Sequence, residues 1–447
     1  MRHIETMRQR FVGAAFLLLL VVASAIPAHA EMKIQEVATQ KGVDAWLVED
    51  YSVPLITIRF YFEGGTAQDP AGKDGLANLM TGLFDEGAGD LDSAAFQKKL
   101  DESGAEMSFT ASRDGIYGTM RLLAEQKSEA LDLLKMAVQS PRFDQAPIDR
   151  IRAQIVSSIR ASSRDPQTEA QDKWSAALYG DHPYSRRSEG SEETLASISA
   201  EDLKTFHKSM FAREKLKIAV VGAIDAETLK GDLDAIFGPL PEKPQLVEIP
   251  DVTPKLNQTV KVEYPLPQAS MQLAYPGVKR SDDDFFAAVL MNHILGGGTF
   301  SSRLFDEVRE KRGLAYGVSS SLVNYDHANA LSIGTSTRAD RAGETLDLIK
   351  TVVRSMTEGG PTEAELTAAK KYLIGGYAIN NLNSSRAIAS TLVELQVEGL
   401  GADYMEKRGD LINAVTLEQV KAAATKLLIN DPAILIVGPA TAEESGG

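Results

Sequence analysis

The sequence predicts an α+β protein built from two homologous domains, and two internal repeats carry this prediction. Residues 129–140 (EALDLLKMAVQS) resemble residues 344–355 (ETLDLIKTVVRS), and seven of the twelve positions are identical. Residues 195–222 parallel residues 411–438, and both segments end with a helical pattern, a short turn and an apolar strand that closes on Val-Gly. The two offsets, 215 and 216, agree closely, so the repeating unit is a whole domain and not a short solenoid repeat.

The first copy alternates short strands with amphipathic helices. Strands are expected at residues 45–50 and 54–63, and a hairpin is expected at residues 106–123. The expected helices cover residues 75–84, 93–103 and 128–138. This order predicts that helices pack on a mainly antiparallel sheet in each domain.

The domain bounds follow from the repeats and from a proline-rich stretch between them. We expect an N-terminal domain at residues 31–240 and a C-terminal domain at residues 255–447. The linker at residues 241–254 lies in a run rich in proline, which is typical of an extended and fairly stiff spacer.

The N-terminus has the pattern of a secretory signal peptide. Arg2, Arg8 and Arg10 form a basic start, residues 11–26 are apolar, and Ala28-His29-Ala30 is an A-x-A cleavage site. We therefore expect residues 1–30 to be removed after Ala30 and the protein to be periplasmic or exported from a bacterium. A permanent membrane anchor is the alternative, but the apolar run is short for a span and the A-x-A sequence favours cleavage.

Composition excludes several classes of function. The chain of 447 residues has no cysteine, which excludes disulfides, cysteine-ligated metals and a lipid-anchored cysteine at the cleavage site. Its formal net charge is −15, and an acidic surface argues against nucleic-acid binding. No apolar run after the signal peptide approaches transmembrane length.

Motifs in both copies resemble those of a known family. The motifs are residues 64–78 (GGTAQDPAGKDGLAN), His182-Pro-Tyr-Ser185 with Gly190, residues 223–225 (AID), residues 294–304 (ILGGGTFSSRL) and residues 308–317 (VREKRGLAYG). On these motifs the chain resembles the pitrilysin/insulinase superfamily, which includes the mitochondrial processing peptidases. The resemblance covers essentially all of the chain after residue 30. It implies two homologous α+β domains that face each other like a clam shell.

The resemblance also exposes a degenerate zinc motif. Active members read G-L-A-H-x-x-E-H-x-x-F, in which two histidines on one helix face hold the ion and the glutamate activates water. Here Asn78, Thr81 and Gly82 stand at the three functional positions, while the apolar stripe of the helix is kept. The family's third ligand is a downstream glutamate, and residues 151–163 contain no acidic residue. We therefore expect this chain to bind no metal and to be inactive alone.

A second motif suggests how an inactive chain would still contribute. The family includes two-chain enzymes in which the zinc-less subunit offers an Arg/Tyr pair from its second domain to the partner's active site. Arg309 and Tyr316 match that pair, with the family's spacing of seven. A helix is expected at residues 301–312, ended by Gly313, and a strand at residues 314–322. A guanidinium can hold a peptide carbonyl, and a phenol can donate to a developing oxyanion.

Ordinary structural roles compete with these assignments. Arg309 lies in the mixed-charge run at residues 306–312, which is typical of a solvated helix face. Tyr316 shares strand parity with Leu314 and Val318, which favours a core tyrosine.

Three further features favour structural roles or leave the role open. The glycines at residues 296–298 indicate a tight turn, because no Lys-Ser/Thr follows as in a phosphate loop. The four histidines after residue 30 show no ligand spacing and are expected to be structural: His182, His207, His293 and His327. Residues 106–111 are either an edge strand that takes up substrate as a further strand or an ordinary paired strand.

The function predicted from these observations is that of a non-catalytic, substrate-binding subunit of a periplasmic zinc metalloendopeptidase. The expected partner is a homologous subunit with an intact H-x-x-E-H motif, which would carry the zinc, and the expected substrates are peptides. The alternative is a structural or peptide-holding protein with no proteolytic role. An enzyme active on its own with an unusual site is disfavoured by the missing ligands.

Overall fold

The computed structural model describes residues 32–439, so the predicted signal peptide lies outside the described residues. The N-terminal half forms a six-stranded sheet in the order β1-β2-β8-β3-β7-β6. Its strands are β1 (Gln35–Ala38), β2 (Asp44–Glu49), β3 (Leu55–Glu63), β6 (Glu106–Ala111), β7 (Gly115–Leu123) and β8 (Lys217–Gly222). All neighbours are antiparallel except β2 and β8, which run parallel.

The C-terminal half repeats this topology. Its five-stranded sheet has the order β11-β12-β10-β13-β9. The strands are β9 (Gln258–Glu263), β10 (Gln268–Pro276), β11 (Ala315–Asn324), β12 (Asn329–Arg338) and β13 (Ala433–Gly438). Strands β9 to β13 take the places of β2, β3, β6, β7 and β8, and the one parallel pair, β9 with β13, is again in the equivalent place. The prediction of two homologous α+β domains with mainly antiparallel sheets is confirmed, whereas their residue bounds stay a prediction.

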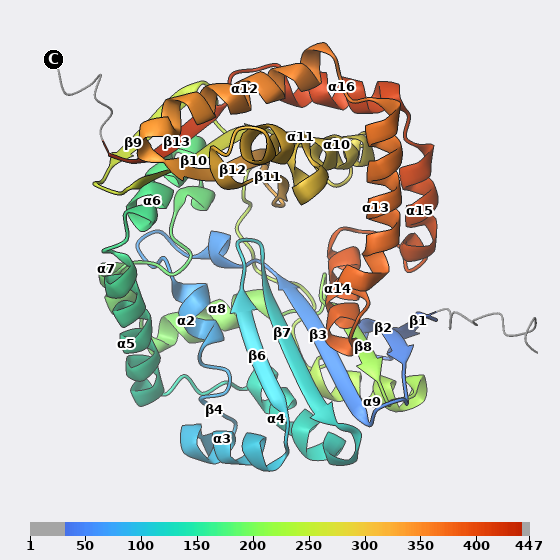
Figure 1. The fold of residues 1–447 in the computed structure, drawn as a ribbon. Helices are drawn as coiled ribbons and strands as arrows, with labels where there is room; N and C mark the ends of the chain where they lie inside the picture. The colour runs from blue at the N-terminus through green and yellow to red at the C-terminus, as the bar shows by residue number, and fades with distance from the viewer. Residues whose placement is uncertain (1–31, 440–447) are drawn as a thin grey trace, which may run out of the picture.

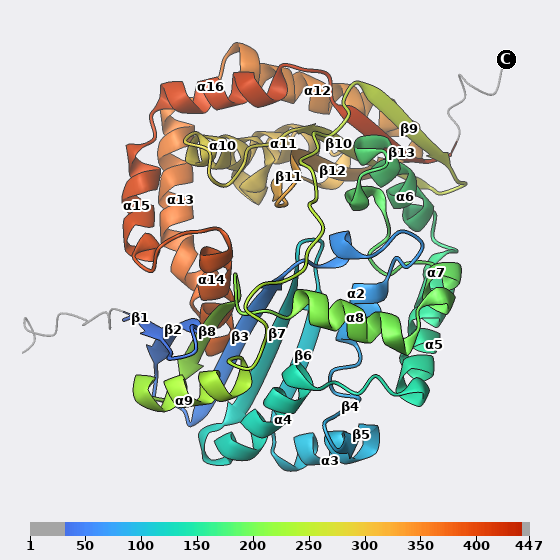
Figure 2. The same cartoon turned by 180° about the vertical axis from the view of Figure 1, so that it is seen from behind.

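Most of the helices in each half lie on one face of that half's sheet, and one helix in each half packs elsewhere (Figures 1 and 2). Those of the N-terminal half are α2 (Leu76–Thr81), α3 (Ser93–Glu102), α4 (Lys127–Gln139), α5 (Gln145–Ser162), α6 (Pro166–Tyr179), α7 (Glu192–Ser197), α8 (Ala200–Met210) and α9 (Ala226–Ile236), with a small hairpin of β4 (Gly87–Ala88) and β5 (Leu91–Asp92). Those of the C-terminal half are α10 (Phe285–Asn292), α11 (Arg303–Phe305), α12 (Ala342–Glu358), α13 (Glu363–Asn381), α14 (Ser385–Val397), α15 (Tyr404–Ala414) and α16 (Leu417–Leu428). The inward side chains of β3 show the pattern, since Ile56, Ile58, Phe60 and Phe62 are all buried in the first core.

The other face of each sheet is covered by a helix from the opposite half. Helix α14 places Ala389, Leu392 and Val393 against Val48, Tyr61, Ala219 and Val221 of the first sheet. Helix α6 places Ala170, Trp174 and Leu178 against Val262, Ala274, Ala433, Leu435 and Val437 of the second sheet. Both views show α14 beside β8 and α6 beside β9 and β13 (Figures 1 and 2). Helix α6 follows α5 in the N-terminal half and α14 follows α13 in the C-terminal half, so α6 and α14 are equivalent helices. Each packs on the sheet of the other half, and the two halves close like a clam shell.

Two predicted helices are shorter than expected. Helix α2 ends at Thr81 and not near residue 84, because Gly82 leaves the helical conformation as its C-cap. The helix expected at residues 301–312 is interrupted: α11 covers Arg303–Phe305, and Asp306–Glu310 forms a π-helical segment in which the Lys311 amide donates to the Asp306 carbonyl at 2.9 Å. Gly313, with φ of 59°, ends this segment, as the sequence predicted.

Residues 241–254 contain neither helix nor strand and run along both halves. The Gln245 amide donates to the Ser209 carbonyl at 2.7 Å, and the Val252 amide donates to the His327 carbonyl at 2.8 Å. His182 lies beside this run, since its Nε2–H donates to the Pro250 carbonyl at 2.8 Å while its Nδ1 accepts the Tyr184 amide at 3.1 Å. The linker is thus fixed to both domains and is not a free spacer.

The exchanged helix can be tested by truncating one buried side chain. Leu392 is fully buried between α14 and the first sheet, so Leu392→Ala should lower the free energy of unfolding by about 2–5 kcal/mol. Leu411→Ala on α15 is the matched control, because Leu411 is exposed and its truncation should change that free energy by less than about 0.5 kcal/mol. Urea unfolding of both variants makes the comparison, and equal effects would contradict the packing of α14.

Candidate functional site

Helix α2 is fixed at its start by the side chain of Asp69. Both carboxylate oxygens of Asp69 accept backbone N–H groups at its start, from Gly75 at 2.8 Å and Ala77 at 2.9 Å. Its apolar stripe, including Leu79 and Met80, is fully buried. The amphipathic prediction for this segment therefore holds, although the helix itself is short.

The three replaced positions do not fit a zinc ion. The Thr81 hydroxyl donates to the Asn78 carbonyl at 2.8 Å and so serves the helix itself. A Cβ added at Gly82 would lie 3.0 Å from Cγ2 of Ile151, so the position faces an apolar side chain of α5. Within residues 32–439 no group of three or more His, Cys, Asp or Glu side chains is placed to hold a metal ion. No metal chemistry can be derived for these residues.

His207 lies behind this helix as a packed core residue. Its ring contacts Phe211 at 4.4 Å and Phe84 at 6.0 Å, and its Nε2–H donates to the Val138 carbonyl at 2.9 Å. Burial lowers the pKa of His207 to about 4, so the imidazole is neutral at neutral pH.

The pH dependence of stability should report this buried imidazole. Between pH 6.5 and about 4 the unfolded chain binds a proton that the folded chain does not, so the free energy of unfolding should fall as the pH drops through this window. At about 1.4 kcal/mol per pKa unit, the loss amounts to about 3 kcal/mol. His207→Phe removes the proton-binding group and should flatten this part of the profile in urea unfolding at several pH values. An unchanged slope would contradict the assignment.

Restoring the motif should not restore a zinc peptidase. The variant with Asn78→His, Thr81→Glu and Gly82→His regains two imidazoles and a base, but α5 opposite Gly82 presents the apolar Ile151, and residues 151–163 contain no acidic residue to act as a third ligand. We expect less than one zinc per chain after dialysis and no peptide cleavage. Adding Ile151→Glu supplies a carboxylate from α5 and should raise zinc affinity. Stoichiometric zinc in the first variant would contradict this account.

Arg309 and Tyr316 lie together on the surface. The Arg309 guanidinium carbon is 5.0 Å from the ring centre of Tyr316 and 4.7 Å from that of Phe305, and Tyr316 is 89% exposed. The ion pair between Arg309 Nε and Glu310 Oε1 is long, at 3.7 Å. Among the described residues none forms a hydrogen bond with the Arg309 guanidinium, so its nitrogens remain available to a ligand.

A β-bulge explains why Tyr316 is not in the core. Pairing between β11 and β12 shifts register between Ala315 and Val318, so Tyr316 and Gly317 have no paired residue on β12. Leu314 and Val318 are buried as strand parity predicts, but the bulge breaks the parity between them. The core interpretation of Tyr316 is therefore wrong. In both views β11 lies on the side of the C-terminal half that faces the N-terminal sheet (Figures 1 and 2).

One outer strand of the first sheet offers a free edge. Strand β6 is at the edge of the first sheet, so it is an edge strand and its outer hydrogen-bonding side has no strand neighbour within residues 32–439. Such an edge can take up an extended peptide as a further strand.

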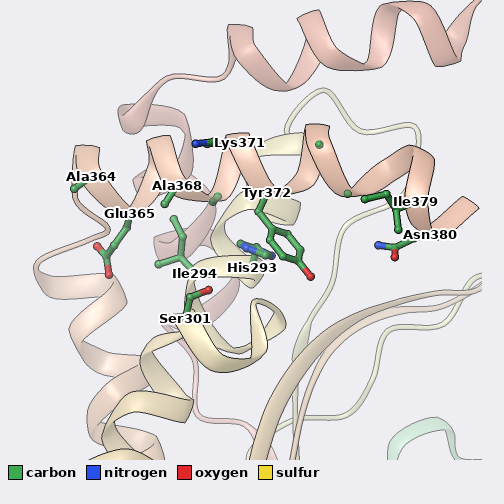
Figure 3. A pocket seen from close by; sticks show the side chains of 13 residues that line it. His293, Ile294, Ser301, Ala364, Glu365, Ala368, Lys371, Tyr372, Ile379 and Asn380 are labelled. Atoms are coloured by element: carbon green, nitrogen blue, oxygen red, sulfur yellow. The ribbon is translucent and has the colours of Figure 1, made fainter. Parts of the chain in front are cut away.

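A groove beside α13 was not predicted from the sequence. It has a volume of about 890 Å³ and lies between α13 and the π-helical segment His293–Gly297. Figure 3 shows Tyr372, Ile379 and Asn380 on one side of α13, with His293 and Ile294 on the opposite wall. The Tyr372 ring is 4.9 Å from the His293 ring. The one available signal was the pair Gly375-Gly376 inside a helical pattern, which leaves a gap in the helix surface.

No helix within residues 32–439 combines the length and the apolar character needed to cross a membrane.

Two protein-family models match the chain. The model for the insulinase family of M16 peptidases matches residues 46–192, and the model for the peptidase M16 inactive domain matches residues 197–373. The "Uncharacterized zinc protease YmxG" of Bacillus subtilis is 25% identical and covers 91% of this chain and 98% of its own length. The "Non-peptidase homolog YmxG" of Helicobacter pylori is also 25% identical, over 91% of this chain and 94% of its own length.

A solved structure agrees with these matches. The peptidase M16 inactive domain from Pseudomonas fluorescens superposes with a TM-score of 0.84 at 31% identity, over 92% of this chain and 99% of that one. Fold and family models lead to one conclusion: the chain belongs to the M16 (insulinase) peptidase family, with Asn78, Thr81 and Gly82 at the functional positions of the metal motif.

Proposed function

We propose that this chain is the substrate-binding subunit of a two-chain zinc metalloendopeptidase and supplies Arg309 and Tyr316 to its partner's active site. The partner would be a homologous chain with an intact H-x-x-E-H motif, which carries the zinc. The single observation that supports this proposal most strongly is the exposed Arg309–Tyr316 pair.

The geometry of the pair suits work on a peptide bond. A tyrosine that is 89% exposed adds little to the stability of the chain, yet the bulge projects it outward and the Arg309 guanidinium lies over its ring. In a water-excluded site between two subunits, the phenol can donate to an oxygen that gains negative charge in the transition state. The planar guanidinium can donate two parallel hydrogen bonds to peptide carbonyls.

Two further features support a role with peptides in an exported protein. The free edge of β6 could add an extended peptide to the first sheet. The basic, apolar and A-x-A pattern of residues 1–30 favours the periplasm as the place of action, with the leader cleaved after Ala30.

The second candidate is a structural or peptide-holding protein with no zinc partner. The degenerate motif, packed by Ile151 and satisfied within its own helix, is equally compatible with this role. The two candidates differ in what the Arg309–Tyr316 pair does, because only the first requires it to affect turnover.

Conservative substitutions in the reconstituted pair of subunits test the proposal. Tyr316→Phe keeps the ring over which Arg309 lies and deletes one donor, so turnover should fall by about 10²–10³-fold while assembly and thermal stability stay nearly unchanged. Arg309→Lys should also lower turnover, because one ammonium cannot reproduce the guanidinium fork.

Matched controls separate a site effect from a general one. Tyr51→Phe and Arg160→Lys change an exposed tyrosine and an exposed arginine of the other half, and both should leave turnover unchanged. Thermal melts and size-exclusion chromatography check folding and assembly. Unchanged turnover in both Tyr316→Phe and Arg309→Lys would refute the proposal and leave the peptide-holding role.

A further inference from the structure

The groove beside α13 occupies the counterpart of the degenerate metal motif in the other half. Helix α13 follows α12 as α5 follows α4, and the segment His293–Gly297 comes before the first hairpin strand of its half as α2 does in the N-terminal half. In the N-terminal half this place is closed, since a Cβ at Gly82 would meet Ile151 at 3.0 Å. In the C-terminal half a groove lies between the corresponding segments, and a Cβ added at Gly375 of α13 would meet no atom within 4 Å.

The lining of the groove is mainly apolar, and Lys371 is the one charged side chain on its walls that forms no ion pair with the described residues. Ile294, Ala368 and Ile379 supply aliphatic surface, and Ile379 is 72% exposed. Burial lowers the pKa of His293, so its imidazole presents a neutral face beneath the Tyr372 ring.

The one carboxylate in the wall is already neutralised. Glu365 Oε1 accepts from Arg303 Nε at 2.6 Å, and Glu365 Oε2 accepts from Arg303 Nη2 at 2.8 Å. This bidentate pair lowers the pKa of Glu365 to about 2. A cationic ligand would therefore find no free negative charge there, whereas an apolar group would lose its contact with water at little polar cost.

The groove is linked to the Arg309–Tyr316 pair through Phe300 and Ser301. Ser301 lines the groove, and its neighbour Phe300 is 74% exposed. The Phe300 ring is 5.0 Å from the Phe305 ring, and the Arg309 guanidinium lies 5.9 Å from the Phe300 ring centre and 5.0 Å from that of Tyr316. Phe300 thus lies between the Arg309–Tyr316 pair and Ser301, the residue of the groove that follows it in the chain.

We propose that the groove binds a large apolar side chain, aromatic or branched aliphatic, of a peptide whose backbone passes Arg309 and Tyr316. This names the substrate class of the proposed function and rests on that function for the ligand being a peptide. The volume of about 890 Å³ lies in the range of ligand sites, and it accommodates such a side chain together with its neighbours. The specificity is for apolar residues and against cationic ones.

Peptide binding to the purified chain alone tests the inference without any zinc partner. Three otherwise identical ten-residue peptides, labelled at one end, carry Phe, Ala or Lys at the central position. Fluorescence anisotropy should give the Phe peptide an affinity about 10- to 100-fold above that of the Ala peptide, as expected for burying one aromatic side chain. The Lys peptide should bind no better than the Ala peptide.

Filling the groove should abolish this preference. Gly375→Leu places a side chain where no atom lies within 4 Å, and leucine favours a helix over glycine, so the variant should fold with an unchanged or higher melting temperature. It should bind the Phe peptide at least 10-fold more weakly. Gly231→Leu is the matched control, because Gly231 is a helical glycine of α9 that also has no atom within 4 Å of an added Cβ, and it should bind like the parent chain.

Each other outcome overturns the inference. Equal binding of the three peptides, or no measurable binding, refutes an apolar subsite. If Gly375→Leu instead converts a dimer to a monomer in size-exclusion chromatography with light scattering, the occupant is a second copy of the chain. This result is independent of the Tyr316→Phe assay. A Phe preference with unchanged turnover would support the apolar subsite and refute the proposal of a zinc partner. Reduced turnover without a Phe preference would support the zinc partner and refute the subsite.

Discussion

The exchange of α6 and α14 between the two halves is the packing constraint on which the rest of the structure depends. Strands β8 (KIAVVG) and β13 (AILIVG) are apolar at nearly every position, so each sheet has two faces to remove from water. The helices of its own half cover only one face. The second face is buried by Leu392 and its neighbours in one sheet and by Trp174 and its neighbours in the other. Neither half can therefore complete its core without the other.

A second contact joins the halves at the tips of two equivalent hairpins. The Tyr184 hydroxyl donates to Asp114 and accepts the His327 amide at 3.1 Å, and Asp114 Oδ2 accepts the Asp326 amide at 3.2 Å. Tyr184 belongs to the His-Pro-Tyr-Ser motif, whose histidine fixes the turn by accepting the Tyr184 amide. Two such contacts at separate places define how far β11 stands from the first sheet, and this distance sets the space in which Arg309 and Tyr316 can meet a peptide.

Periodicity and repeats predicted that the two halves share one topology, but not the local departures that create the candidate site. The duplicated E-x-L-D-L-x-K segments implied equal topology, and β2 to β8 and β9 to β13 have it. Strand parity assigned Tyr316 to the core, and the bulge before Val318 reversed this, because an extra residue in one strand changes the face of its neighbours. The π-helical turn at Asp306–Glu310 was equally invisible, since it depends on tertiary contacts and not on residue type. The groove depends on the distance between α13 and His293, which no local pattern encodes.

The two halves share one topology but differ in their functional side chains. In the N-terminal half, the apolar side chains of α2 are buried as the fold requires. At the former ligand positions, the Thr81 hydroxyl bonds within the helix and Gly82 faces Ile151, so these positions offer no metal ligands. In the C-terminal half, Phe300, Tyr316 and Ile379 remain exposed, although exposed apolar side chains adjoining one another favour association and bring no stability to the monomer. The exposed Tyr316 ring beside the Arg309 guanidinium adds little to the stability of the fold, so folding alone does not explain it. The proposed role in holding peptides at a partner's active site gives these exposed residues a function, and all three lie in the half opposite the replaced metal motif.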